Sequence, residues 1–132
     1  MANDKRADFG FTKLVVADLE RSLAFYRAVA GLEESARVDA EIAGRKISEI
    51  LLHPTTPGGA NLVLLKFLDR PAPAADEAIL GFITADLDAF VARARAAGGS
   101  VYEAIKSMPE HGVRVAFVKD VEGHLIEVVQ PL

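Results

Sequence analysis

One acidic side chain stands out in this sequence as a candidate for chemistry. Glu127 lies within the apolar run Leu125 to Val129, which follows a turn signal at residues 120–123. Because side chains alternate along a strand, Leu125, Glu127 and Val129 share one face, and the other face is also largely apolar. A carboxylate among such neighbours needs a partner or a hydrated cavity. Glu127 is therefore a candidate general base, or else a glutamate at a barrel mouth, half solvated or paired with a nearby lysine.

The histidines do not converge on this carboxylate. His53 lies in a proline-rich turn, His111 in the loop at residues 108–112, and His124 on the strand face opposite Glu127. We expect solvent-facing loop histidines, although the loop of His111 could fold over a pocket mouth. The absence of cysteine excludes a disulfide framework and thiol catalysis, and is compatible with a reducing, cytoplasmic location.

Composition restricts the class of protein. With 132 residues, 51% of them hydrophobic and 26% charged, the chain is expected to form one globular domain over residues 1–132. The net charge is −4 and the basic residues are scattered, so nucleic acid is not an expected partner. The polar N-terminus and the absence of an apolar run of roughly 20 residues predict neither secretion nor a membrane span.

The first half of the chain reads as a strand, a helix and three strands. Asp18 can cap the helix at its start and Gly31 can end it. Apolar residues in the helix recur at helical spacing on one face, which indicates packing on a sheet. The predicted strands are residues 11–16, 33–38, 45–52 and 60–68, and the predicted helix is residues 19–30.

The second half repeats this order after a Pro/Ala connector at residues 69–77. The joint at residues 15–20 and the joint at residues 83–88 both read apolar strand end, Ala, Asp, Leu, acidic residue. Such self-similarity predicts two modules, residues 9–68 and 79–130, that share a core. The predicted elements of the second module are strands at 79–84, 101–105, 113–118 and 125–129, and a helix at 87–97 capped by Asp86.

Two motifs resemble those of the vicinal-oxygen-chelate superfamily, which includes glyoxalase I, bleomycin-resistance proteins and extradiol dioxygenases. The first is Val-x-Asp-Leu-x-x-Ser-Leu-x-Phe-Tyr at Val16 to Tyr26, and the second is Asp-x-x-Gly-x-x-Ile-Glu at Asp120 to Glu127. The resemblance implies an α+β fold in which two tandem βαβββ modules form a cup-shaped mixed sheet with helices outside. One such fold hosts isomerases, lyases, dioxygenases and metal-free binders.

The resemblance also implies where a divalent ion would bind. Family members hold it with His, Gln or Glu side chains on four equivalent strands, and Glu127 matches the last of these positions. Counting seven residues back from each capping Asp gives Phe11 and Ile79, and aligning the two halves places Leu64 opposite Glu127. One carboxylate cannot hold a hard cation tightly, so we expect a degenerate metal site and no metal cofactor.

Strand alternation predicts an apolar pocket with a few polar groups. The expected lining is Phe11, Lys13 and Val15; Leu62, Leu64 and Lys66; Ile79, Gly81 and Ile83; Leu125, Glu127 and Val129. It suits a small, largely apolar organic ligand. Lys13 and Lys66 are expected either to contact this ligand or to pair with Glu127 at the rim. The predicted site residues are Phe11, Lys13, Leu64, Lys66, Ile79 and Glu127.

Three functions are compatible with these residues. The first is a metal-independent binding protein of the bleomycin-resistance type. The second is a lyase, isomerase or dioxygenase, either metal-dependent with its ligands elsewhere, or metal-free with Glu127 as base and Lys13 or Lys66 stabilising an oxyanion. The third is an oligomeric regulatory or structural protein without a ligand. The resemblance further implies a homodimer.

Overall fold

The structure is a computed structural model that describes residues 6–132. Residues 1–5, part of the N-terminal stretch in which no secretion signal is expected, lie outside the described residues. Module 1 consists of β1 (Phe11–Val15), α1 (Leu19–Ala30), β2 (Glu34–Ile42), β3 (Arg45–Leu52) and β4 (Asn61–Phe67). Module 2 consists of β5 (Ile79–Ile83), α2 (Leu87–Ala96), β6 (Ser100–Met108), the short 3-10 helix η1 (Pro109–His111), β7 (Val113–Lys119) and β8 (Leu125–Pro131).

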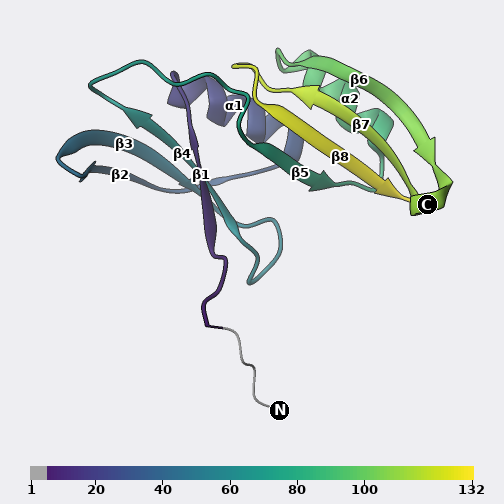
Figure 1. Cartoon of the computed structure of the whole chain (residues 1–132), viewed down its shortest axis with the longest axis horizontal. Coiled ribbons are helices and arrows are strands. Elements are labelled where there is room, and N and C mark those ends of the chain that lie inside the picture. The colour runs from purple at the N-terminus through teal and green to yellow at the C-terminus, as the bar shows by residue number, and fades with distance from the viewer. Residues whose placement is uncertain (1–5) are drawn as a thin grey trace.

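Each module builds its own four-stranded mixed sheet. The strand order is β1-β4-β3-β2 in the first sheet and β5-β8-β7-β6 in the second. In both, the first strand runs parallel to the last and the other pairs are antiparallel. The predicted α+β class with two tandem modules is confirmed. Figure 1 shows the two sheets next to each other, with β1 and β5 as the edge strands on the inner side.

The predicted helix caps are confirmed. A carboxylate oxygen of Asp18 accepts a hydrogen bond from the backbone N–H of Arg21 at 3.0 Å, and Asp86 accepts one from Ala89 at 3.0 Å. Gly31 follows α1 with φ +69°, a left-handed conformation in which glycine has no Cβ penalty. The aspartates therefore fix where each helix begins, directly after its first strand.

Two edge strands are longer than predicted. β2 continues to Ile42 and β6 to Met108, beyond the predicted ends at residues 38 and 105. The β2–β3 hairpin turns at Ala43 and Gly44, which have φ values of 51° and 79°. Two consecutive residues with positive φ form the tight turn that matches strand twist. The sequence signal is weak because the edge strands carry exposed polar side chains.

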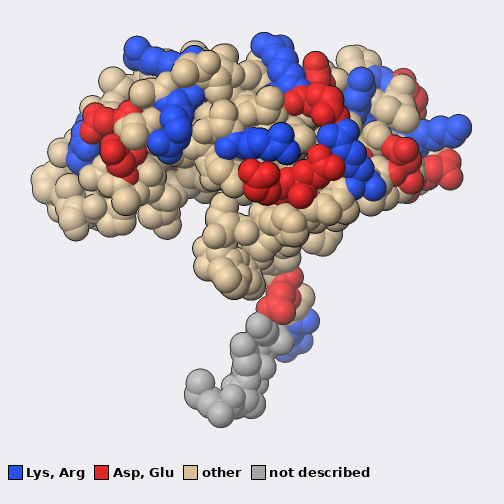
Figure 2. Space-filling view, turned by 180° about the vertical axis from the view of Figure 1, so that it is seen from behind, with Lys and Arg blue, Asp and Glu red and all other residues tan. Residues whose placement is uncertain are grey.

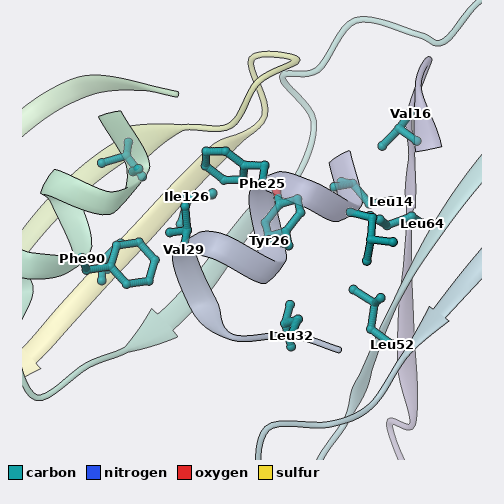
Figure 3. Close-up of a cluster of buried hydrophobic side chains, with 14 of the residues drawn as sticks. Leu14, Val16, Phe25, Tyr26, Val29, Leu32, Leu52, Leu64, Phe90 and Ile126 are labelled. Atoms are coloured by element: carbon teal, nitrogen blue, oxygen red, sulfur yellow. The ribbon is translucent and has the colours of Figure 1, made fainter. Parts of the chain in front are cut away.

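Both helices pack on one side of the sheets and contribute to a common core. Figure 3 shows Phe25, Tyr26 and Val29 of α1 between Leu14 and Leu64 of module 1 and Ile126 of module 2. All six side chains are at most 5% exposed. The two modules are therefore joined through their helix side, and the opposite face of each sheet takes no part in this core.

The surface of the protein carries charges of both signs. On the side seen from behind in Figure 2, acidic and basic side chains intermix. No helix within residues 6–132 is long and apolar enough to cross a membrane.

Candidate functional site

Each sheet has a face that does not contact the helices, and we call it the cup face. In module 1, strand pairing places Lys13 of β1 beside Val63 of β4, and Leu65 of β4 beside Glu49 of β3. In module 2, it places Gly81 of β5 beside Glu127 of β8, and Glu127 beside Phe117 of β7. Because paired residues share a face, these strands form two largely apolar surfaces, with Glu49 on the first and Glu127 on the second.

Glu127 lies on the module 2 cup face with free space beside it. A Cβ built on its neighbour Gly81 would meet no atom within 4 Å. A cavity of about 280 Å³ lies there, lined by Gly81, Phe82, Ile83, Glu127 and Val129. Among the described residues Glu127 has neither a hydrogen-bond partner nor an ion-pair partner, and Lys13 pairs with Glu49 instead, so the alternative in which a lysine pairs with Glu127 is wrong. The carboxylate is left accessible from the cavity.

Lys13 pairs with a different carboxylate. Its Nζ lies 3.0 Å from Oε2 of Glu49, and the Glu49 side chain is 10% exposed. Sequence reasoning missed Glu49, although the run Ile47 to Leu52 gives the same signal as the run around Glu127: an acidic residue at an alternating position between apolar ones. The module 1 cup face therefore carries a cation and an anion together.

The predicted position of Leu64 is wrong by one residue. Phe11 pairs with Asn61 in β4, while its module 2 equivalent Ile79 pairs with Leu125 in β8. Asn61 is thus equivalent to Leu125, and Val63 to Glu127. A slip of one residue moves every side chain of a strand to the other face.

In the observed register, the predicted site residues Leu64 and Lys66 lie on the helix side of the sheet. Leu64 is 0% exposed and belongs to the core beneath the helices. Lys66 shares that face by alternation, so it does not approach Glu127 either. Phe11 and Ile79 lie on the inner edge strands and are 57% and 56% exposed.

The four positions equivalent to the family's metal ligands are thus Phe11, Val63, Ile79 and Glu127. Only the last has a side-chain atom that can bind a cation. Among the residues that the structure describes, no three His, Asp or Glu side chains come together as a metal-binding cluster. A divalent ion needs several oxygen or imidazole ligands, so these residues do not fit the family's metal.

Comparison with known proteins gives the family. Residues 8–128 match the model of the Glyoxalase/Bleomycin resistance protein/Dioxygenase superfamily. The chain belongs to this superfamily. A search of curated proteins finds no significant match.

Solved structures of this superfamily share the fold. A glyoxalase family protein from Bacillus cereus has a TM-score of 0.82 at 21% identity, covering 100% of this chain and 99% of that chain. A glyoxalase/bleomycin resistance protein/dioxygenase family enzyme from Burkholderia phytofirmans has a TM-score of 0.71 at 18% identity, covering 96% of this chain and 100% of that one. A glyoxalase I mutant from Zea mays has a TM-score of 0.67 at 22% identity, covering 95% of this chain and 48% of that chain.

This glyoxalase-superfamily protein also has a buried polar network between its modules. His124 is 7% exposed and Asp120 is 4% exposed, so the expectation of a solvent-facing His124 is wrong. Its Nδ1 lies 2.9 Å from Oδ2 of Asp120, and its Nε2 lies 3.2 Å from the carbonyl oxygen of Val15. Both partners can only accept hydrogen bonds. The imidazolium, with a proton on each ring nitrogen and opposite an ionised Asp120, is the form of His124 that donates to both partners.

The partners of Asp120 stabilise this charged pair. Its carboxylate accepts a hydrogen bond from the Tyr26 hydroxyl at 2.6 Å and from the backbone N–H groups of Glu122 and His124. Burial alone would raise the pKa of Asp120, but the hydrogen bonds from His124 and Tyr26 hold it below its ordinary value. The hydrogen bond with Asp120 raises the pKa of His124 and outweighs the effect of burial.

The same turn contacts the first helix of this superfamily member. Glu122 accepts hydrogen bonds from the backbone N–H groups of Ala17 and Asp18, each at 2.8 Å. Together with the contact from His124 to Val15, these bonds tie the end of β1 to the start of β8. The network thereby fixes the position of one cup face relative to the other.

Proposed function

We propose that this protein binds a small, largely apolar organic molecule on its cup faces without a metal ion. The observation that carries the proposal is Glu127, an unpaired carboxylate beside a cavity with apolar walls. Binding sites for small molecules combine apolar walls with a few polar groups that orient the ligand. The degenerate set Phe11, Val63 and Ile79 at the other family positions favours an organic ligand over a chelated ion.

A homodimer is part of this proposal. The hollow at Glu127 measures about 280 Å³ and is open to solvent, and a larger one of about 1010 Å³ that shares Gly81, Phe82 and Ile83 with it lies on the other side of β5. Phe11, Ile79 and Ile83 expose 57%, 56% and 78% of their surface along the inner edge strands. Exposed apolar patches of this kind mark interaction surfaces. A twofold dimer would place the module 1 cup face of one protomer near the module 2 cup face of its partner and enclose two equivalent pockets.

Metal-free enzymatic activity is the second candidate. It is favoured by the absence of any cation partner for Glu127 within residues 6–132, because a free carboxylate can accept a proton from a bound substrate. Lys13 is held by Glu49 of its own chain, so an oxyanion partner would have to come from elsewhere in the pocket. A cytoplasmic location accompanies both candidates and is supported by the cysteine-free composition.

The first experiment is metal analysis of protein purified without chelator, combined with a fragment screen by ligand-observed NMR. We expect far less than one metal ion per chain, together with binding of small aromatic fragments that changes in Glu127→Gln. Glu110→Gln, at an exposed position on η1, is the matched control and should bind like the wild type. A stoichiometric metal ion that is lost in Glu127→Gln would contradict the proposal.

A further inference from the structure

The Lys13–Glu49 pair has no role in the site that the family pattern describes. Glu49 lies on β3, which supplies none of the four family positions. It is 9% exposed, and its strand neighbours on the cup face include Leu65 at 2% and Ile47 at 1%. Lys13 lies above it with a side chain that is 35% exposed. The pair is thus a polar group set into an apolar sheet face, with the anion below and the cation at the surface.

Stability does not account for this pair. Taking two charges out of water costs about as much as their attraction returns, and replacing a buried pair by apolar side chains is often neutral or stabilising by roughly 1–4 kcal/mol. The surroundings of Glu49 are aliphatic and could accommodate a leucine. An ion pair at this position is therefore better explained by something that it binds.

Both members of the pair have unused hydrogen-bonding capacity. Glu49 Oε2 is buried and makes no hydrogen bond among the described residues, since the Lys13 ammonium approaches at 3.0 Å without hydrogen-bond geometry. A buried acceptor without a hydrogen bond is costly. The Lys13 ammonium has three N–H donors and faces the open side of the sheet. The pair therefore offers a donor at the surface and, beneath it, an acceptor that a ligand reaches through the 10% of the Glu49 side chain that remains exposed.

We propose that the Lys13–Glu49 pair recognises a neutral carboxamide or ureido group of the ligand. Lys13 donates a hydrogen bond to the carbonyl oxygen, and Glu49 accepts one from the neighbouring N–H. A carboxylate ligand would be repelled by Glu49 and an ammonium ligand by Lys13, whereas a group with an adjacent acceptor and donor satisfies both. This assignment rests on the proposed binding function and names the chemical class of its ligand.

The test is a chemical-shift titration of the 15N-labelled full chain with four benzene derivatives of similar size: benzamide, benzoate, benzylamine and acetophenone. We expect benzamide to bind about tenfold more tightly than acetophenone, which keeps the carbonyl acceptor for Lys13 but lacks the N–H donor for Glu49; tenfold corresponds to about 1.4 kcal/mol, near the lower end of the contribution of one hydrogen bond to a charged group. The largest shifts should fall on the strands that carry Lys13 and Glu49.

Two variants complete the test. Lys13→Met alone leaves a buried unpaired carboxylate, so the double variant Lys13→Met/Glu49→Leu provides a stably folded comparison and should lose the preference for benzamide. Lys46→Met, at an exposed position on the opposite, helix-side face of β3, is the matched control and should keep the preference. Equal binding of all four compounds to the wild type would overturn the inference and leave apolar binding intact. If no compound shifts a cup-face resonance, both the inference and the proposed function fail.

Discussion

Two glutamates with the same sequence signal occupy different electrostatic surroundings. Glu49 and Glu127 each interrupt an apolar strand on a cup face, yet Glu49 has a lysine at 3.0 Å and Glu127 has free space beside Gly81. Lys13 on β1 reaches Glu49 on β3 across the intervening β4, whereas the equivalent position on β5 is Gly81, which has no side chain to pair with Glu127. A repeated fold therefore presents one paired carboxylate and one that is available to a ligand.

The His124 imidazolium predicts a defined dependence of stability on pH. Its pKa is raised in the folded protein, so its stabilising contribution is complete below the ordinary value of 6.5 and is lost as pH rises through the raised pKa. Urea unfolding should therefore show lower stability at pH 9 than at pH 6. The expected loss is on the order of 1.5–3 kcal/mol, the contribution of a hydrogen bond to a charged group.

Variants at two histidines separate this effect from other titrations. His124→Gln should be less stable than the wild type at pH 6 and should lose most of the pH dependence. His53→Gln, at an exposed position, should retain the wild-type profile. An unchanged difference between pH 6 and pH 9 in His124→Gln would show that another group is responsible.

At the scale of elements, the β7–β8 turn acts as a cap for α1. Glu122 accepts both backbone N–H groups that precede the helix, and its charge lies at the positive end of the helix dipole. Glu122→Ala should lower the free energy of unfolding by about 1–2 kcal/mol, within the range for lost helix caps. Chemical denaturation provides the measurement, with Glu110→Ala on η1 as the exposed control. A loss below about 0.3 kcal/mol would show that water replaces the carboxylate.

The helices and the order of strands could be predicted from the sequence because their signals are local. Asp18, Asp86 and Gly31 act within one turn of their own positions. Which side chains of β4 point to the cup face could not be predicted, because Leu62 to Leu65 are all apolar and both faces of the strand are buried. Register there depends on pairing with β1 and β3, and an alignment of the two halves can slip by one residue.

Within the candidate site, features set by one strand could be predicted, and contacts between distant strands could not. The cup-face position of Glu127 followed from alternation in β8. The partner of Lys13 did not, because Glu49 lies 36 residues away in a strand that the family pattern leaves out. The buried hydrogen bonds of His124 could not be predicted either, because its partners Asp120 and Val15 meet only when both modules are folded.

At the scale of the whole molecule, the exposed apolar edge predicts association. Ile83 on β5 is 78% exposed, and we expect sedimentation of the wild type as a dimer at micromolar concentration. Ile83→Glu should shift the protein toward the 14.1 kDa monomer without unfolding it. Ile42→Glu, at a 39% exposed position at the far end of β2, is the matched control. A wild type that sediments only as a monomer would contradict the proposed dimer.

The hydrogen bonds of Glu122 also determine the order in which the protein can fold. The start of α1 is held by a side chain 104 and 105 positions later in the chain. During synthesis, module 1 emerges first and can pair its strands and cap its helix with Asp18, but the N–H groups of Ala17 and Asp18 lack the Glu122 carboxylate and the core stays incomplete until the β7–β8 turn arrives. The duplicated sequence therefore yields a single cooperative folding unit, and a fragment that ends after β4 should unfold far more easily than the intact chain.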